Sequence, residues 1–173
     1  RVDLEPQALA TAAGLPPSTR LRRPSQYRRS PNHHPGNSAP VAYRAHGDGA
    51  LALRSMRWGL VPSFTKLAAE EQEKMRMPSH FKMFNARSET VSEKSFRRLL
   101  KRRRCVVAFN GFYEWKNQGG GGSSGGGSSR EKQPYYVHFK DDRPMLMAAL
   151  YDTWRVPDGA SALRGAGQKK AAA

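Results

Sequence analysis

The strongest fold signal in the chain is the stretch Cys105-Val106-Val107-Ala108-Phe109-Asn110-Gly111-Phe112-Tyr113-Glu114-Trp115. Its first five residues form a short apolar run, which predicts a buried strand over 105–109. Glu114 follows between two aromatic residues. A carboxylate beside aromatic walls is desolvated, which raises its pKa towards the range that a general acid/base needs at neutral pH. An equally good interpretation is a rim glutamate paired with one of the chain's many arginines.

The segments on either side of this stretch predict a mixed α+β fold, a single domain with a strand-rich core and short helices. Apolar residues recur at helical spacing within 2–15, before a glycine that suits a helix end. Further strands are predicted over 41–44, 51–58, 135–139 and 145–151. The last of these is apolar throughout, so we expect it to be buried on both faces.

Other segments of the chain predict helices, a linker and a tail. Short helices are expected over 67–77 and 92–100. Residues 119–129 are all glycine or serine, and because predicted strands flank them they indicate a flexible insertion in a strand–strand loop. We therefore expect one domain over 1–154, followed by a low-complexity, disordered tail over 155–173.

Charge is the clearest guide to a partner. The 173 residues include 30 Lys and Arg against 14 Asp and Glu, a formal net charge of +16. Such an excess attracts polyanions, of which nucleic acid is the commonest large example. No apolar run approaches the roughly 18 residues of a membrane span, and the N-terminus lacks a secretory layout. We expect no membrane partner and no secretion.

The single cysteine and the histidines offer little chemistry on their own. Cys105 follows three arginines, which would lower a thiol pKa, yet its place in an apolar run favours a buried structural role. His33 and His34 fall in a loop and are interpreted as solvated residues rather than metal ligands. Standard motifs for metals and phosphate loops are missing, so no metal and no cofactor is expected.

Two more clusters contain polar and aromatic side chains suited to nucleic acid. In 84–90, Asn85 can donate and accept hydrogen bonds, and Arg87 can bind a phosphate through two donors. In 56–64, Trp58 and Phe64 flank a turn next to an arginine, a combination that sequence-tolerant single-strand binders use. The alternatives are an ordinary helix-entry loop for the first cluster and a buried tryptophan for the second.

Taken in order, these blocks resemble the SOS response-associated peptidase (SRAP) family. The resemblance rests on Arg57-Trp58-Gly59-Leu60-Val61-Pro62-Ser63, Asn85-Ala86-Arg87-Ser88-Glu89-Thr90, Arg104-Cys105-Val106-Val107 with Gly111-Phe112-Tyr113-Glu114-Trp115, Gln133-Pro134-Tyr135-Tyr136, and Ala148-Ala149-Leu150-Tyr151-Asp152. It implies a single α+β SRAP-type domain that takes part in the DNA damage response. The implied partner is single-stranded DNA with abasic sites, bound by a monomer in a eukaryotic nucleus or a bacterial cytoplasm.

The resemblance also implies a chemistry and a set of roles. Family members form a thiazolidine cross-link to the abasic sugar through an N-terminal cysteine, after autopeptidase removal of the leader methionine. Asn85 matches the asparagine that positions the terminal amine, and Glu114 matches the acid/base carboxylate. Arg87 matches a phosphate contact, while Trp58 and Phe64 match the aromatic segment that lines the DNA channel.

The chain departs from the family pattern at both ends. The family begins Met-Cys-Gly-Arg where this sequence begins Arg1-Val2-Asp3, and a later His-Asp-Arg-Met-Pro motif has no counterpart. Because the central blocks match, we expect truncation at both ends rather than divergence. Whether the chain is an enzyme stays open at this point. The alternative is a catalytically dead single-stranded-DNA-binding paralogue, or a non-functional gene fragment.

Overall fold

The computed structural model describes residues 1–45, 49–66, 83–92, 94–117 and 132–155. Its elements follow one another as α1 (Pro6–Ala12), β1 (Leu21–Arg22), the 3₁₀ helix η1 (Pro24–Gln26), β2 (Ser38–Arg44), β3 (Leu51–Arg57), α3 (Lys94–Arg97), β4 (Arg104–Phe109), β5 (Gly111–Asn117), β6 (Lys132–His138) and β7 (Met145–Leu150). This strand-rich arrangement with short helices confirms the predicted α+β class.

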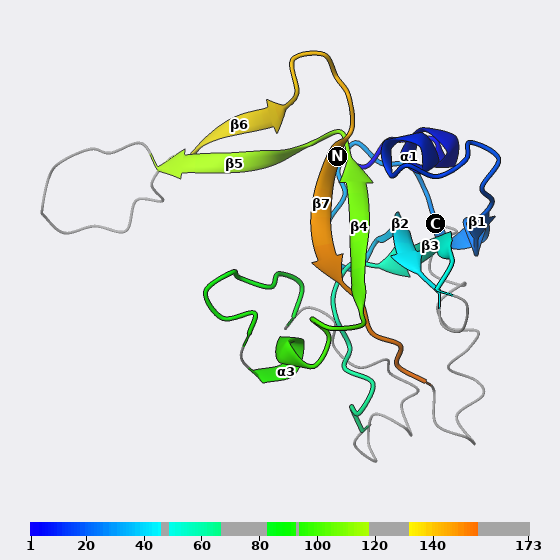
Figure 1. Ribbon diagram of the computed structural model, residues 1–173. Helices are drawn as coiled ribbons and strands as arrows, with labels where there is room; N and C mark the ends of the chain where they lie inside the picture. Colours follow the sequence, from blue (N-terminus) through cyan, green and yellow to red (C-terminus); the bar gives the residue numbers. More distant parts are fainter. Residues whose placement is uncertain (46–48, 67–82, 93, 118–131, 156–173) are drawn as a thin grey trace, which may run out of the picture.

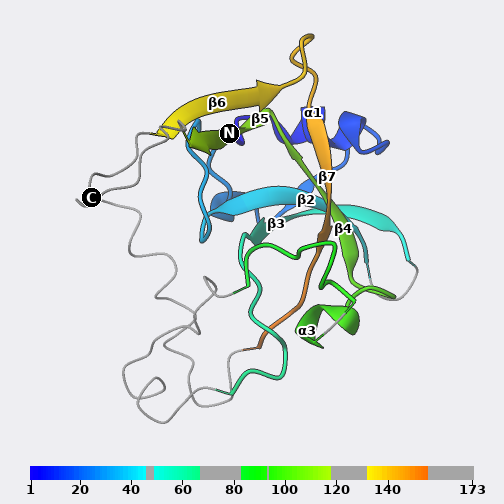
Figure 2. The same ribbon diagram turned by 90° about the vertical axis from the view of Figure 1, so that its left-hand side faces the viewer.

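The strands form a five-stranded sheet in the order β1-β3-β2-β4-β7 and a separate two-stranded sheet of β5 and β6. Within the larger sheet β1 runs parallel to β3, and the other neighbours are antiparallel. The β5–β6 ribbon leaves the end of β4 as an arm (Figure 1). Figure 2 shows α3 beyond the opposite end of β4. β4 therefore lies between the arm and the region of α3.

The core lies between α1 and the larger sheet. Leu9 and Leu53 are fully buried there, and they pack with Ala42 and Ala108 from neighbouring strands. Because side chains alternate along a strand, the intervening residues face the other side, where Val41, Tyr43, Cys105 and Tyr151 form a second cluster. Burial of Cys105 confirms the structural interpretation of this residue.

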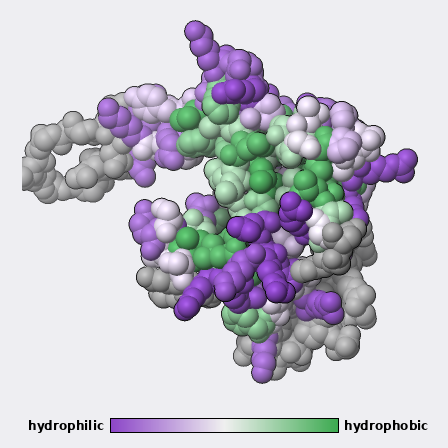
Figure 3. All heavy atoms as spheres, in the orientation of Figure 1, coloured by the Kyte–Doolittle hydropathy of each residue, from purple (hydrophilic) through white to green (hydrophobic). Residues whose placement is uncertain are grey.

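β7 differs from its predicted environment. Its apolar run was expected to be buried on both faces, but Leu146 and Met147 are 50% and 51% exposed. The physical reason is its position, because β7 is the last strand of the sheet and pairs only with β4. Figure 3 shows the resulting apolar surface over the upper parts of β4 and β7.

The remaining predictions meet different outcomes. The helix expected over 92–100 shortens to Lys94–Arg97, although Leu99 just after it is buried. The helix expected over 67–77, the Gly/Ser stretch 119–129 and the tail 156–173 fall outside the described residues. The strands on either side of that stretch do pair antiparallel, as a hairpin requires. Among the described helices, none has the length and apolar character of a membrane span.

Candidate functional site

Residue 1 is anchored where β4 passes into β5. The amine of Arg1 donates to the carbonyl of Gly111 over 2.8 Å, and the amide of Asn110 donates to the Arg1 carbonyl over 3.0 Å. The side chain of Asn110 also accepts from the Asp3 amide over 2.8 Å. Only a glycine fits at 111, because a Cβ there would lie 2.5 Å from the Val137 carbonyl oxygen. The start of the chain is therefore held at the base of the β5–β6 arm.

A second set of contacts holds the same segment from the other side. Val2 and Ser30 exchange two backbone hydrogen bonds of 3.0 and 2.9 Å, and the Tyr27 hydroxyl donates to the Leu4 carbonyl over 2.8 Å. Arg29 lies 2.8 Å from the Asp3 carboxylate, and its hydrogen bond, with a further one from Arg1, lowers the pKa of Asp3. These contacts leave residues 1–5 little freedom.

His33 connects this region to Trp58. The two rings are stacked, with planes 5° apart and centroids separated by 6.3 Å. Both ring nitrogens of His33 are buried and have no hydrogen-bond partner among the described residues. The pKa of His33 is lowered to about 4, mainly by burial and to a smaller extent by the nearby ammonium of Arg1 and by His34. The prediction of a solvated loop histidine is therefore wrong, because the ring of Trp58 covers it.

Trp58 in turn contacts the segment that carries Asn85. Its indole Nε1 donates to the Phe84 carbonyl over 2.9 Å, and the Phe84 ring meets it edge-on at 6.3 Å. Asn85 follows directly, with an exposed side chain, and Arg87 is exposed as well. The structure thus places Trp58 against His33 on one side and against Phe84, the residue before Asn85, on the other.

Glu114 lies on the arm, three residues beyond the contact with Arg1. At about 3.4 Å per residue this places its Cα roughly 10 Å from that of Gly111. It is paired across the ribbon with Tyr135, and both residues line a shallow hollow of about 460 Å³ with Trp115 and Lys116. The expected desolvation is not present, because the side chain of Glu114 is exposed. Within the described residues no hydrogen bond or ion pair joins Glu114 to Asn85 or Arg87.

Phe64 lies apart from this group, in the region of α3 at the other end of β4. The Arg98 guanidinium stacks on its ring, with 4.9 Å between the guanidinium carbon and the ring centroid. The side chain is nevertheless 62% exposed. The six residues of β4 span roughly 20 Å at about 3.3 Å each. The predicted site residues therefore occupy an extended surface rather than one pocket.

Cys105 is excluded as a reactive thiol. It lies in β4 within the sheet core, and burial raises its pKa to about 12. The arginines before it do not reverse this effect. In the described part of the chain, no group of acidic, histidine or cysteine side chains could hold a metal ion.

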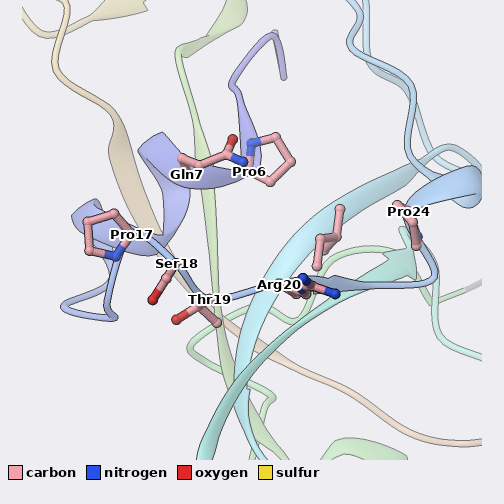
Figure 4. A pocket seen from close by; sticks show the side chains of 8 residues that line it. Pro6, Gln7, Pro17, Ser18, Thr19, Arg20 and Pro24 are labelled. Carbon is pink, nitrogen blue, oxygen red and sulfur yellow. The ribbon is translucent and has the colours of Figure 1, made fainter.

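A second hollow, of about 470 Å³, lies between the start of α1 and the segment that leads into β1 (Figure 4). Pro6, Gln7 and Arg20 are among its lining residues. None of the residues predicted to act on DNA lines it. We therefore place the candidate site around residue 1, Trp58 and the arm.

Comparison with known proteins agrees with the resemblance seen in the sequence. The family model of the SOS response associated peptidase (SRAP) matches residues 2–166. The abasic site processing protein HMCES from Gallus gallus is 35% identical over an alignment of 167 positions, which covers 82% of this chain and 45% of that protein. The abasic site processing protein YoqW from Bacillus subtilis is 36% identical over 108 residues, covering 62% and 40% of the two chains.

Solved structures share the fold. A protein from Bacteroides thetaiotaomicron, 28% identical, superimposes with a TM-score of 0.50 over 69% of this chain and 43% of its own. A phage-related protein from Bordetella bronchiseptica, 23% identical, gives 0.51 over 86% and 57%. The chain thus spans less than half the length of the HMCES protein that it matches. The match of the family model to nearly the whole chain shows that it belongs to the SRAP family.

Proposed function

We propose that this chain is part of an abasic site processing protein that binds single-stranded DNA and cross-links to abasic sites. The proposal places the reactive cysteine ahead of Arg1, because the one cysteine present, Cys105, is buried. It also assigns to the protein the removal of its own leader methionine. A monomer acting in a eukaryotic nucleus or a bacterial cytoplasm fits this activity.

The observation that carries the proposal is the anchoring of Arg1 at Gly111 and Asn110. A residue that precedes Arg1 would begin at the base of the arm that carries Glu114. His33, whose pKa is lowered in part by the ammonium of Arg1, stacks on Trp58. These contacts support a site in which a terminal amine, an aromatic wall and a carboxylate act on one substrate.

The proposed reaction balances without a cofactor. The terminal amine adds to the aldehyde carbon of the opened abasic sugar, and loss of water leaves an imine. The thiol of the same cysteine then adds across the carbon–nitrogen double bond, which closes a thiazolidine ring. Glu114 carries protons in these steps, and Asn85 orients the amine through its amide. Arg87 holds a phosphate, and Trp58 and Phe64 contact the bases.

The test compares this chain preceded by Met-Cys-Gly with the same chain preceded by Met-Ser-Gly. Each protein is incubated with an oligonucleotide that contains one abasic site, and adducts are counted on a denaturing gel. We expect a denaturant-resistant adduct with the cysteine form only. Glu114→Gln should slow its formation about a hundredfold if proton transfer limits the rate. Equal adduct formation by both proteins, or none by either, contradicts the proposal.

Arg87→Ala separates binding from chemistry. It should weaken non-covalent binding and lower the slope of log affinity against log salt by about one unit, because one phosphate contact is lost. Cross-linking of a saturated complex should change less than the affinity. If Arg87→Ala changes only the rate, the role assigned to this residue is wrong.

The buried state of Cys105 favours a second candidate for the chain as printed, a DNA-binding module that does not react. Its net charge of +16 predicts an affinity for single strands that falls steeply with salt. Fluorescence anisotropy with an intact oligonucleotide measures this slope. An affinity that does not change with salt contradicts this candidate.

A further inference from the structure

We propose that Asp152 and Arg98 are positioning residues that hold Phe64 for stacking against an unpaired base of a DNA strand. The inference rests on the DNA binding proposed above and adds to it two residues from distant parts of the sequence. It concerns the region beyond the α3 end of β4, away from Glu114 and residue 1.

Phe64 is displayed by a tight turn over residues 62–65. The amide of Thr65 donates to the Pro62 carbonyl over 2.9 Å, which closes the turn with Ser63 and Phe64 at its tip. On the far side, the Thr65 carbonyl accepts from the Trp154 indole over 2.9 Å. The turn is therefore tied to a segment almost ninety residues later.

Asp152 is the centre of this attachment. Its side chain is only 1% exposed, although the residue follows the edge strand β7. It accepts from the Ser63 amide over 2.7 Å and from the Thr153 amide over 2.9 Å, and it forms an ion pair with Arg98. Burial alone would raise the pKa of Asp152, but these hydrogen bonds together lower it. The carboxylate is thus held charged beneath the turn.

Arg98, the residue that follows α3, provides the remaining contacts that hold the turn. One guanidinium nitrogen bonds the Asp152 carboxylate, and another donates to the Ser63 hydroxyl over 3.2 Å. The guanidinium also lies over the Phe64 ring, 4.9 Å from its centroid. Three directed contacts leave the planar group one orientation, so the ring resting on it is fixed as well.

This arrangement indicates that the turn serves to bind a ligand and not only to stabilise the fold. Phe64 remains 62% exposed, so the ordered turn does not serve to bury it. An aromatic ring with a cation on one face and solvent on the other is a stacking platform, and every nucleobase has a π-face to offer. The net charge of +16 makes a polyanionic strand the partner that fits.

The chain contains a matched control of the same chemistry. In the loop after β6, Arg143 lies 3.7 Å from the Asp141 carboxylate and 4.3 Å from the centroid of the Phe139 ring. Asp141 is 65% exposed and does not anchor a turn to another element. Asp141→Asn therefore makes the same chemical change outside the proposed site.

The experiment measures the affinity of the full chain for an intact single-stranded oligonucleotide, which needs no cross-linking. Phe64→Ala should weaken binding about tenfold, as loss of one base stack does. Asp152→Asn should weaken it about threefold, although removal of a negative charge would by itself tighten binding to DNA. In the Phe64→Ala background, Asp152→Asn should cause no further loss. Asp141→Asn should leave the affinity unchanged or slightly raised.

A fluorescent base analogue, 2-aminopurine, reports stacking directly. Placed at successive positions in the strand, it should be perturbed at one position by the original protein and not by Phe64→Ala or Asp152→Asn. Arg98→Gln tests the same positioning role with little risk to folding, because the Arg98 side chain is 36% exposed. Arg143→Gln is its charge-matched control. Arg98→Gln should weaken binding more than Arg143→Gln does.

The outcomes separate this inference from the function proposed above. If the original chain binds and the Phe64 and Asp152 variants bind as tightly, the positioning role is wrong while DNA binding stands. Additive losses from Phe64→Ala and Asp152→Asn also overturn it, because Asp152 would then act independently of Phe64. If the original chain does not bind single strands at low salt, both proposals fall.

Discussion

Acid should destabilise this protein through His33 as the pH falls from 7 to 5. Both ring nitrogens are buried beside Trp58 and have no hydrogen-bond partner in the part of the chain that the structure describes, so the folded state favours the neutral ring. The pKa of His33 falls from 6.5 to about 4 on folding. The unfolded chain therefore binds more protons between these values, and stability decreases as the pH falls through that window.

The size of the effect follows from the two pKa values. Between pH 7 and pH 5 the linkage relation predicts a loss of about 1.8 kcal/mol in the free energy of unfolding, and about 1.3 kcal/mol if partial solvation halves the shift. This is a large part of the roughly 5–15 kcal/mol typical of folded domains. Asp3, Glu89 and Asp152, whose pKa values are lowered on folding, lose their contributions only as the pH falls below their ordinary carboxyl values of 3.8 to 4.5, outside the interval from pH 7 to pH 5.

Urea unfolding at pH 7, 6 and 5 measures the loss. His33→Gln, whose side chain does not titrate, should unfold with a much smaller difference between pH 7 and pH 5 than the original chain. His34→Gln is the matched control, because the neighbouring ring is exposed, and it should keep the original pH dependence. A His33→Gln protein that loses as much stability as the original would refute this reasoning.

Three further predictions concern stability and reactivity. Leu53→Ala empties a fully buried core position and should cost about 2–4 kcal/mol in urea unfolding. Gly111→Ala forces a Cβ to within 2.5 Å of a carbonyl oxygen, so it should destabilise the fold by about 1–3 kcal/mol and release residue 1. A urea-unfolding midpoint equal to that of the original chain would contradict this prediction. Cys105 should react with a thiol reagent at pH 8 only as fast as the protein opens, since burial raises its pKa to about 12; rapid labelling would contradict this.

The local pattern of apolar residues predicts most of the strands correctly. The apolar run at Cys105–Phe109 lies in β4, and the strands predicted over 41–44, 51–58 and 135–139 overlap β2, β3 and β6. Each of these depends on alternation or apolarity within a few residues, which the sequence displays directly. The helix is shorter than the predicted range 92–100, because among the described residues of that range only Lys94–Arg97 are helical.

Long-range packing determines the features that the local sequence pattern does not predict. The apolar run of β7 suggested two buried faces, but strand order leaves it at an edge with one neighbour. His33 looked like a solvated loop residue until the ring of Trp58 stacked on it. The attachment of Ser63 to Asp152 joins residues 89 apart, a separation at which no local periodicity exists.

The amino-acid sequence by itself determined the α+β class, most of the strands, the basic character and the family resemblance, because these depend on composition, short-range period and motif order. Tertiary structure alone decided that residue 1 lies against Gly111, that Trp58 lies beside the segment of Asn85, and that Arg98 and Asp152 support Phe64. Such contacts arise because backbone groups and charges removed from water must find partners wherever the folded chain brings them.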